Sequence, residues 1–268
     1  METALHNILE RVRAAAADAT PLRLCGGGSK DFHGLALEGT PLELRPLRGI
    51  ISYEPTELVV TARAGTPLQE LQATLAQAGQ ALAFEPPHFA LGDKQPTVGG
   101  MVAAGWSGPA RASSGAVRDF VLGVEIINGR GELLRYGGQV MKNVAGYDVS
   151  RLMAGSWGTL GVITEVSLKV LPVAPAQATL VFAMNEAQAL EALNRWGGQP
   201  LPLNASCWAQ GQLWLRLCGA QAAVQAACQK LGGERLPDDQ AAALWHSLRE
   251  QQHRQHLVRV QQFQRGGG

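Results

Sequence analysis

Hydrophobic residues along the chain follow two spacings, one typical of amphipathic α-helices and one typical of β-strands. Helical spacing predicts helices at 3–17, 66–79, 186–196, 220–231 and from about residue 238. Alternating or β-branched runs predict strands at 22–25, 42–44, 49–53, 57–62, 119–128, 132–136, 162–170, 179–184, 203–208 and 212–218. Helices and strands mixed in this way indicate an α+β protein.

The helix predicted at 66–79 has clear end signals. Thr66 and Gln69 form a capping-box pattern, and Pro67 is expected at the first helical position. Gly79 follows the last apolar position and is expected to be the C-cap. This helix is interpreted as structural.

Pro172 and Pro175 interrupt the pattern and divide the chain. Residues 1–173 are expected to form one domain and residues 174–268 a second. In the second, the order strand, helix, strand, strand, helix is most of a ferredoxin-like sandwich, short of its last strand. Residues 251–268 have little apolar periodicity and end on three glycines. We therefore expect an incomplete second domain with a frayed C-terminal tail.

Charge and composition exclude several classes of protein. The formal net charge is +1 and basic residues do not cluster, so no nucleic-acid-binding surface is indicated. No apolar run reaches the roughly 18 residues of a membrane span. The N-terminus lacks the positive start and apolar core of a signal peptide. The sequence therefore predicts a soluble cytoplasmic protein.

The cysteines and histidines do not predict a metal site. None of the four cysteines has the close spacing that zinc and iron–sulfur sites use, and we expect reduced, half-buried thiols. They are Cys25, Cys207, Cys218 and Cys228. His253 and His256 stand three apart, but metal ligation needs more oriented partners than this segment offers.

Glycine is concentrated in the middle of the chain. Residues 97–161 contain 14 glycines in 65 residues, against the roughly four or five that an average content of about 7% gives. Glycine has no Cβ, so it allows backbone to come close to a partner. The excess indicates that this backbone wraps around something.

The stretch from Gly155 to Leu171 places three glycines directly before a β-branched strand. A Rossmann dinucleotide site has the order strand, Gly-x-Gly-x-x-Gly, helix. Here Val149, Leu152 and Met153, at helical spacing, precede the glycines, and the strand follows them. A Rossmann site is therefore excluded. The residues leave open a simple glycine turn or a backbone segment beside a cofactor.

Two other glycine stretches suit an anion. Residues 26–30 read Gly-Gly-Gly-Ser-Lys, which can turn backbone N–H groups inward as an anion nest or form a flexible hairpin tip. Gly99 and Gly100 open a short helix of small residues, whose first N–H groups can bind an anion.

Three polar residues near these glycines each have two interpretations. His88 follows two prolines and is a catalytic base or a surface or packing residue. Lys142 and Asp148 form a surface ion pair or helix cap, or they contact a ligand directly. The sequence identifies no catalytic residue.

The three glycine stretches also occur in a definite order. Residues 26–30, 96–105 and 155–164 together resemble the FAD-binding domain of the vanillyl-alcohol oxidase / p-cresol methylhydroxylase (PCMH-type) superfamily. Within it, residues 84–88 and 140–161 look like the FAD-binding E subunit of bacterial glycolate oxidase, and the similarity covers residues 1 to about 250. The resemblance implies a PCMH-type FAD-binding fold of two α+β subdomains, followed by a partial ferredoxin-like cap domain.

The resemblance also implies which residues hold FAD. Two loops are expected to bind the pyrophosphate through N–H groups, a third segment to run beside the cofactor, and Asp119 to lie on the adenine side. The residues are Gly26, Gly27, Gly28, Ser29, Lys30, Thr97, Val98, Gly99, Gly100, Gly105, Ser107, Asp119, Gly158, Gly161 and Ile163. Members with covalent flavin have a His in or near these loops. Because Ser29 and Lys30 follow the glycines here, we expect noncovalent FAD.

For activity, the resemblance implies an FAD-dependent oxidoreductase that oxidises glycolate or a related 2-hydroxy acid such as D-lactate to the 2-oxo acid. Electrons then pass from flavin to an iron–sulfur subunit, which must be a separate protein because this chain has no cysteine cluster. A larger homologous flavin subunit is a further expected partner. The complex is cytoplasmic or peripheral at the inner membrane. A stand-alone dehydrogenase and a non-catalytic assembly subunit that keeps the fold remain alternatives.

Overall fold

The computed structural model describes residues 2–34, 38–138 and 148–252, and the chain divides into two compact units. The first unit is Met1–Trp106 with Gly115–Pro172, and the second is Ser107–Ser114 with Val173–Gly268. The change of unit after Pro172 lies one residue before the predicted boundary. The segment Ser107–Ser114 belongs to the second unit, although its place in the sequence is within the predicted first domain.

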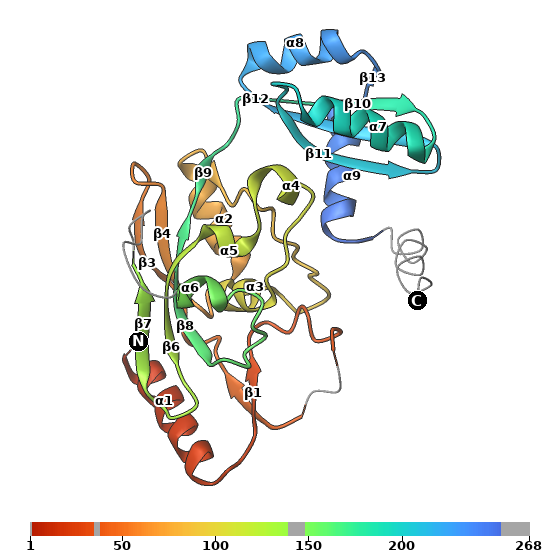
Figure 1. Cartoon of the computed structure of the whole chain (residues 1–268). Coiled ribbons are helices and arrows are strands. Elements are labelled where there is room, and N and C mark those ends of the chain that lie inside the picture. The colour runs from red at the N-terminus through yellow and green to blue at the C-terminus, as the bar shows by residue number, and fades with distance from the viewer. Residues whose placement is uncertain (1, 35–37, 139–147, 253–268) are drawn as a thin grey trace. The chain divides into compact units, whose positions relative to one another are not determined.

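A five-stranded antiparallel sheet is the centre of the first unit (Figure 1). Its strands, in spatial order, are β3 (Ile50–Glu54), β4 (Val59–Arg63), β8 (Val162–Lys169), β6 (Val121–Ile127) and β7 (Leu133–Gly137). A separate antiparallel pair joins β5 (Gln80–Ala81) to β9 (Leu171–Pro172). The predicted strands at 49–53, 57–62, 132–136 and 162–170 are confirmed, with ends that differ by at most two residues.

Four helices contribute apolar side chains to one face of this sheet. They are α2 (Leu68–Gln77), α3 (Val98–Ala104), α5 (Val117–Phe120) and α6 (Val149–Leu152), the last through the adjoining Met153. Leu71 of α2, Val98 of α3 and Val166 of β8 are fully buried. Each such side chain contributes about 1.5–3 kcal/mol through burial, so this layer is the main core of the unit.

The start of α2 differs from the prediction. Thr66 does not cap the helix, because its Oγ1 accepts a hydrogen bond from Gly49 N at 2.9 Å and donates one to Gly49 O at 3.1 Å. The N-cap residue is Pro67, without a side-chain hydrogen bond. Thr66 is fully buried, and a buried hydroxyl must find partners wherever the fold supplies them. At the other end of α2 the C-cap residue is Ala78, and Gly79, the predicted C-cap, directly follows it.

The strand predicted at 119–128 begins later, at Val121. The preceding residues form the short helix α5, and Asp119 lies within it. Asp119 Oδ2 accepts a hydrogen bond from Ala116 N at 2.8 Å. This bond satisfies an amide at the start of the turn and favours helix over strand.

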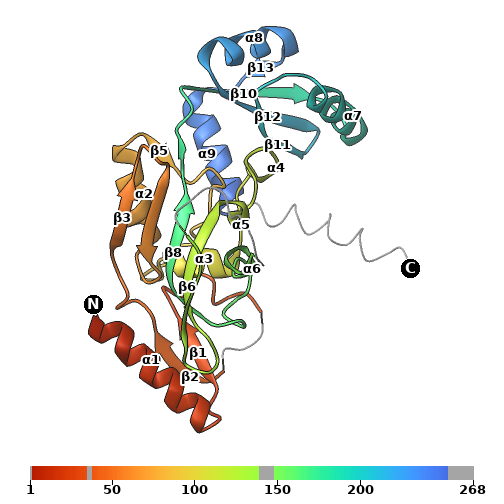
Figure 2. The ribbon, with the colours of Figure 1, turned by 60° about the vertical axis from the view of Figure 1, so that its left-hand side comes forward.

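A helix and a parallel strand pair form the other layer of the unit. The predicted helix at 3–17 is confirmed as α1 (Glu2–Ala17), which lies beside β1 (Leu22–Cys25) and β2 (Thr40–Glu43) (Figure 2). Ile8 and Val12 of α1 share a core cluster with Leu42 of β2. Because β1 and β2 are parallel, they need a crossover connection. The loop after β1 is therefore not a hairpin tip.

Four charged side chains form a row across the other face of the five-stranded sheet, on Arg63, Glu165, Glu125 and Arg135. Arg63 Nη1 lies 3.3 Å from Glu165 Oε2 and 3.4 Å from Glu125 Oε1. Arg135 Nε lies 2.7 Å from Glu125 Oε2. Burial, followed by the charge of Glu125, raises the pKa of Glu165, while Arg63 and Arg135 act in the opposite direction.

Replacing Glu165 with glutamine is expected to stabilise the protein at neutral pH. A carboxyl group with a raised folded-state pKa destabilises the folded state once the pH exceeds its unfolded pKa of about 4.3. The variant lacks this cost. Its melting temperature should exceed that of the wild type at pH 7, and the difference should vanish below about pH 4. Glu57→Gln, at an exposed position, is the control. A lower melting temperature at pH 7 would show that the ion pair with Arg63 dominates.

The second unit contains a four-stranded antiparallel sheet with the order β11-β12-β10-β13. Along the chain its elements are β10 (Ala176–Ala183), α7 (Glu186–Gly197), β11 (Leu203–Ala209), β12 (Gln212–Gly219), α8 (Gln221–Leu231), β13 (Glu234–Arg235) and α9 (Asp238–Arg249). The predicted helices and strands of this part are confirmed. The expectation that the last strand is missing is wrong, because β13 pairs with β10.

Two core clusters stabilise the second unit. Helices α7 and α8 pack on the sheet around Leu213 and Leu215. Trp245 of α9 packs against Ala205 of β11 in a smaller cluster. The short helix α4 (Arg111–Ser114) also belongs here, and Ser113 Oγ donates a hydrogen bond to Asn204 O at 2.7 Å. Most of the tail predicted to fray, from residue 253 onward, lies outside the described residues.

Candidate cofactor-binding site

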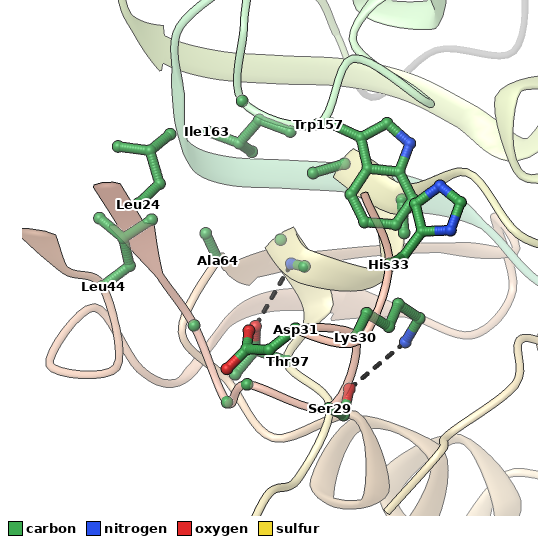
Figure 3. A pocket seen from close by; sticks show the side chains of 18 of the residues that line it. Leu24, Ser29, Lys30, Asp31, His33, Leu44, Ala64, Thr97, Trp157 and Ile163 are labelled. Carbon is green, nitrogen blue, oxygen red and sulfur yellow. Dashed lines mark hydrogen bonds between the residues drawn. The ribbon is translucent and has the colours of Figure 1, made fainter. Parts of the chain in front are cut away.

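Three segments of the first unit, far apart in the sequence, line one pocket (Figure 3). They contribute Gly26, Gly27, Gly28, Ser29, Lys30, Asp31 and His33; then Thr97, Gly99, Gly100, Ala103 and Ala104; then Trp157, Gly158, Gly161 and Ile163. Leu24, Leu44 and Ala64 complete the wall. The cavity volume of about 200 Å³ is below the ~300–1,000 Å³ of pockets that enclose a drug-sized ligand. It therefore suits part of a dinucleotide.

The first segment is a glycine loop pressed against the strand-like segment at residues 95–97. A Cβ on Gly27 would overlap the carbonyl oxygen of Gln95, and one on Gly26 would lie 2.8 Å from Thr97 Oγ1. Gly28 has a φ of 71°, and its carbonyl accepts a hydrogen bond from Asp31 N at 3.2 Å. The loop is thus a tight turn whose shape requires glycine.

The backbone N–H groups of this loop are available to a ligand. Across residues 2–34, 38–138 and 148–252, the amides of Gly26, Gly27, Gly28 and Ser29 have no hydrogen-bond acceptor. Lys30 Nζ donates to Ser29 Oγ at 3.4 Å and to Pro87 O at 3.3 Å, which places a positive charge beside them. Unpaired amides next to a cation attract an anion. Of the two interpretations of the loop, the structure favours the anion nest.

The second segment is the start of α3, and its amides already have acceptors. Val98 N donates to Thr66 O at 2.9 Å, Gly99 N to Ala64 O at 2.8 Å, and Gly100 N to Thr97 Oγ1 at 3.3 Å. The expectation that this helix start offers unpaired N–H groups is therefore wrong. Its glycines instead allow close packing, since a Cβ on Gly99 would lie 2.6 Å from Ala64 Cβ.

The third segment joins α6 to β8, as the reversed glycine order predicts. Gly155 N donates to Val102 O at 3.1 Å and Trp157 N to Ala103 O at 2.9 Å, so the loop is attached to the end of α3. Gly161 has a φ of 144°. A Cβ there would lie 2.8 Å from Ile127 O, which explains why glycine is needed before the strand.

Four predicted cofactor residues do not line this pocket. Val98 points into the core and is fully buried. Gly105 is the C-cap of α3 with a φ of 68°. Ser107 begins the segment that belongs to the second unit, and Asp119 closes the turn of α5. Their contact with the cofactor stays a prediction.

Several residues of the pocket wall are not among the predicted cofactor residues. They are Leu24, Asp31, His33, Leu44, Ala64, Ala103, Ala104 and Trp157. Asp31 and His33 directly follow the glycine loop, so their position was a usable signal. Leu24 lies in β1 and Leu44 directly follows β2, and the parallel pairing of these two strands brings them together.

Two other candidate residues have structural partners. His88 Nε2 lies 2.8 Å from Gln72 Oε1, which fits a packing role. Asp148 caps α6, since its Oδ1 accepts from Arg151 N at 3.1 Å. Burial alone would raise the pKa of Asp148, but Ser150 and Arg151 together lower it. Lys142, His253 and His256 lie outside the described residues.

The described residues show neither a metal site nor a membrane helix. They include no group of three or more His, Cys, Asp or Glu side chains arranged to hold a metal ion. None of the helices in this part of the chain is long and apolar enough to cross a bilayer. Within the described residues the four cysteines form no disulfide bond, and each is half-buried.

Comparison with known proteins identifies the family. Residues 5–137 match the family described as FAD binding domain. The chain is 50% identical to glycolate oxidase subunit GlcE of Escherichia coli (strain K12) over 245 residues. The aligned residues make up 91% of this chain and 68% of that protein. The chain belongs to the GlcE family. Its cofactor is FAD, and the predicted PCMH-type FAD-binding fold is confirmed.

More distant relatives of this GlcE-family chain match a little over half of it. Glycolate oxidase subunit GlcD of Bacillus subtilis (strain 168) is 32% identical over 59% of this chain and 32% of its own length. D-lactate dehydrogenase of Anaerostipes hadrus is 33% identical over 58% of this chain and 31% of its own length. The chain thus spans about a third of these two proteins.

A solved structure of alkyldihydroxyacetonephosphate synthase has the same fold as this GlcE-family chain. The TM-score is 0.67 at 17% identity, over 91% of this chain and 56% of that one. Whether the second unit is a ferredoxin-like cap stays a prediction.

The pocket fits FAD as the cofactor of a GlcE-family chain. FAD carries a pyrophosphate. The amides of Gly26–Ser29, which have no acceptor in the part of the chain that the structure describes, offer donors to it, and Lys30 offers positive charge. Gly100 is exposed and lines the pocket without a side chain that would fill it. The apolar wall at Leu24, Leu44 and Ile163 suits a flat ring.

Proposed function

We propose that this chain is the FAD-binding subunit of a glycolate oxidase complex. The complex would oxidise glycolate, or a related 2-hydroxy acid such as D-lactate, to the 2-oxo acid. The proposal includes noncovalent FAD, a larger homologous flavin subunit, and an iron–sulfur subunit that receives the electrons. It also places the complex in the cytoplasm or peripherally at the inner membrane.

One observation carries the proposal. A loop whose amides have no hydrogen-bond acceptor within the described residues lines a pocket that suits part of a dinucleotide, in a chain that is 50% identical to a glycolate oxidase subunit. Such a loop binds phosphate oxygens through several weak donors at once, with Lys30 adding charge. Bound FAD supplies the hydride-accepting chemistry that amino-acid side chains lack.

The lining residues support binding and orientation. Ser29 is 8% exposed and Thr97 is 5% exposed, so both polar groups are held at fixed positions. Lys94 Nζ lies 3.4 Å from Asp31 Oδ2, which offsets the negative charge that Asp31 brings to the pocket. No residue of the chain is proposed as catalytic.

The test begins with FAD binding by the purified chain. We expect stoichiometric FAD uptake, seen as flavin absorbance that survives gel filtration and is released on denaturation. Release of free FAD would also support noncovalent attachment. A chain that takes up no FAD would overturn the proposal.

The second step separates the subunit from a stand-alone enzyme. Glycolate-dependent reduction of an artificial electron acceptor is measured for the chain alone and for the chain co-purified with the larger flavin subunit and the iron–sulfur subunit. The proposal expects activity only in the complex. Equal activity of the chain alone would favour a stand-alone 2-hydroxy acid dehydrogenase.

A further inference from the structure

Five aromatic residues form a contact cluster beside the FAD pocket. The aromatic cluster consists of Phe32, His33, Phe89, Trp106 and Trp157. His33 stacks on Trp157 with ring centroids 4.6 Å apart and an interplanar angle of 24°. Trp106 meets both rings edge-on, at 5.0 Å from His33 and 5.7 Å from Trp157.

Only two members of the aromatic cluster line the pocket, namely His33 and Trp157. Trp157 has a φ of 52°, a left-handed conformation that is unfavourable for a bulky residue. Its N–H bond to Ala103 and its stack on His33 keep it there. Backbone strain of this kind persists where surrounding contacts impose it, and it is frequent at ligand sites.

The two ends of the pocket differ in character. Leu24 and Leu44 lie on one side and the Trp157–His33 stack on the other (Figure 3). Trp157 is 40% exposed, whereas Ile163 in the apolar wall is 4% exposed. The glycine loop and the start of α3 also line the pocket. FAD likewise has two flat ring systems joined by a pyrophosphate.

We propose that the Trp157–His33 stack positions the isoalloxazine half of FAD, and that the apolar end takes the adenine half. This inference rests on the proposed function. Because substrate and electron acceptor must reach the isoalloxazine ring, this ring is expected at the exposed end of the pocket. At that end Trp157 is 40% exposed and Phe32 is 52% exposed. Aromatic side chains offer such a ring a stacking or edge contact. Trp157 and His33 are thus positioning residues.

The experiment compares FAD with ADP, which has the adenine half and both phosphates but no flavin. In Trp157→Leu, the Kd for FAD is expected to rise at least about tenfold, by the usual strength of ring stacking. The Kd for ADP should stay within about twofold of wild type. Trp157→Phe keeps a ring and should restore most of the FAD affinity. Leu160→Ala is the matched control, because Leu160 lies on the same loop, is 47% exposed and does not line the pocket.

The outcomes distinguish the inference from the proposed function. If Trp157→Leu weakens FAD and ADP equally, or weakens neither, the inference is overturned while the wild type still binds FAD. If the wild type binds neither ligand, the proposed function itself fails. Circular dichroism and the melting temperature show whether each variant is folded. Should Trp157→Leu not fold, His33→Leu decides by the same comparison, because His33 is exposed and contributes the other half of the stack.

Discussion

Replacing Gly100 with valine is expected to abolish FAD binding and to leave the protein folded. Gly100 is exposed within α3 and lines the pocket. Beyond its own helix, a Cβ there would meet Thr97 Oγ1 at 3.1 Å and no other atom of the described residues within 4 Å. The added side chain would therefore occupy the space of the cofactor. We expect FAD affinity to fall at least about 100-fold, or about 3 kcal/mol, by titration calorimetry.

The control for this variant is Gly197→Val. Gly197 is also an exposed helical glycine, and within the described ranges no atom lies within 4 Å of its Cβ position, but it lies in α7 of the second unit. The Gly197→Val variant should bind FAD with the same affinity as the wild type. Gly99→Val is not an equivalent test, because a Cβ there would lie 2.6 Å from Ala64 Cβ and disturb the core. Unchanged FAD affinity in folded Gly100→Val would rule out this pocket as the FAD site.

Replacing Gly27 with alanine is expected to have the largest effect on stability. Its Cβ would overlap the carbonyl oxygen of Gln95, which is backbone and cannot rotate away as a side chain does. Overpacking typically costs about 1–3 kcal/mol and occasionally more, and a clash with backbone falls at the upper end. We expect a large drop in melting temperature and in soluble yield, together with loss of FAD retention.

Gly129→Ala is the matched control for Gly27→Ala. Gly129 lies in the turn between β6 and β7, and no atom of the described residues lies within 4 Å of its Cβ position. This variant should melt within a few degrees of the wild type. If Gly27→Ala also melts like the wild type, the loop does not pack against residue 95 as described.

Local sequence patterns were enough to predict most of the first unit. The order of α6, three glycines and β8 was readable because glycine and β-branched residues mark turns and strands directly. The glycine loop at residues 26–29 was readable for the same reason. Its amides have no acceptor in the described part of the chain, which agrees with the anion nest, one of the two interpretations that the residues left open.

Errors arose where a distant segment decides the local structure. Thr66 looks like a helix cap, but Gly49, 17 residues away, satisfies its hydroxyl. The amides of Val98 and Gly99 looked unpaired because their acceptors, Thr66 O and Ala64 O, lie in a loop more than 30 residues earlier. Tertiary partners of this kind leave no local signal.

Distant contacts also explain why the structure of the second unit differs from the prediction. β13 has only two residues and is recognisable only through its pairing with β10, more than 50 residues earlier. Ser107–Ser114 resembles a loop of the first domain, yet the bond from Ser113 to Asn204 ties it to the second unit. Strand pairing and unit membership depend on contacts that a single sequence does not reveal.

The attachment of α3 to the loop after β4 has a consequence for loading of the cofactor. Because Ala64 O and Thr66 O accept hydrogen bonds from the start of α3, the chain itself fixes one wall of the site. The conformational entropy lost on cofactor binding would then fall mainly on the glycine loop, whose amides have no acceptor among the described residues. FAD would meet one wall that is already fixed and one loop that it has to order.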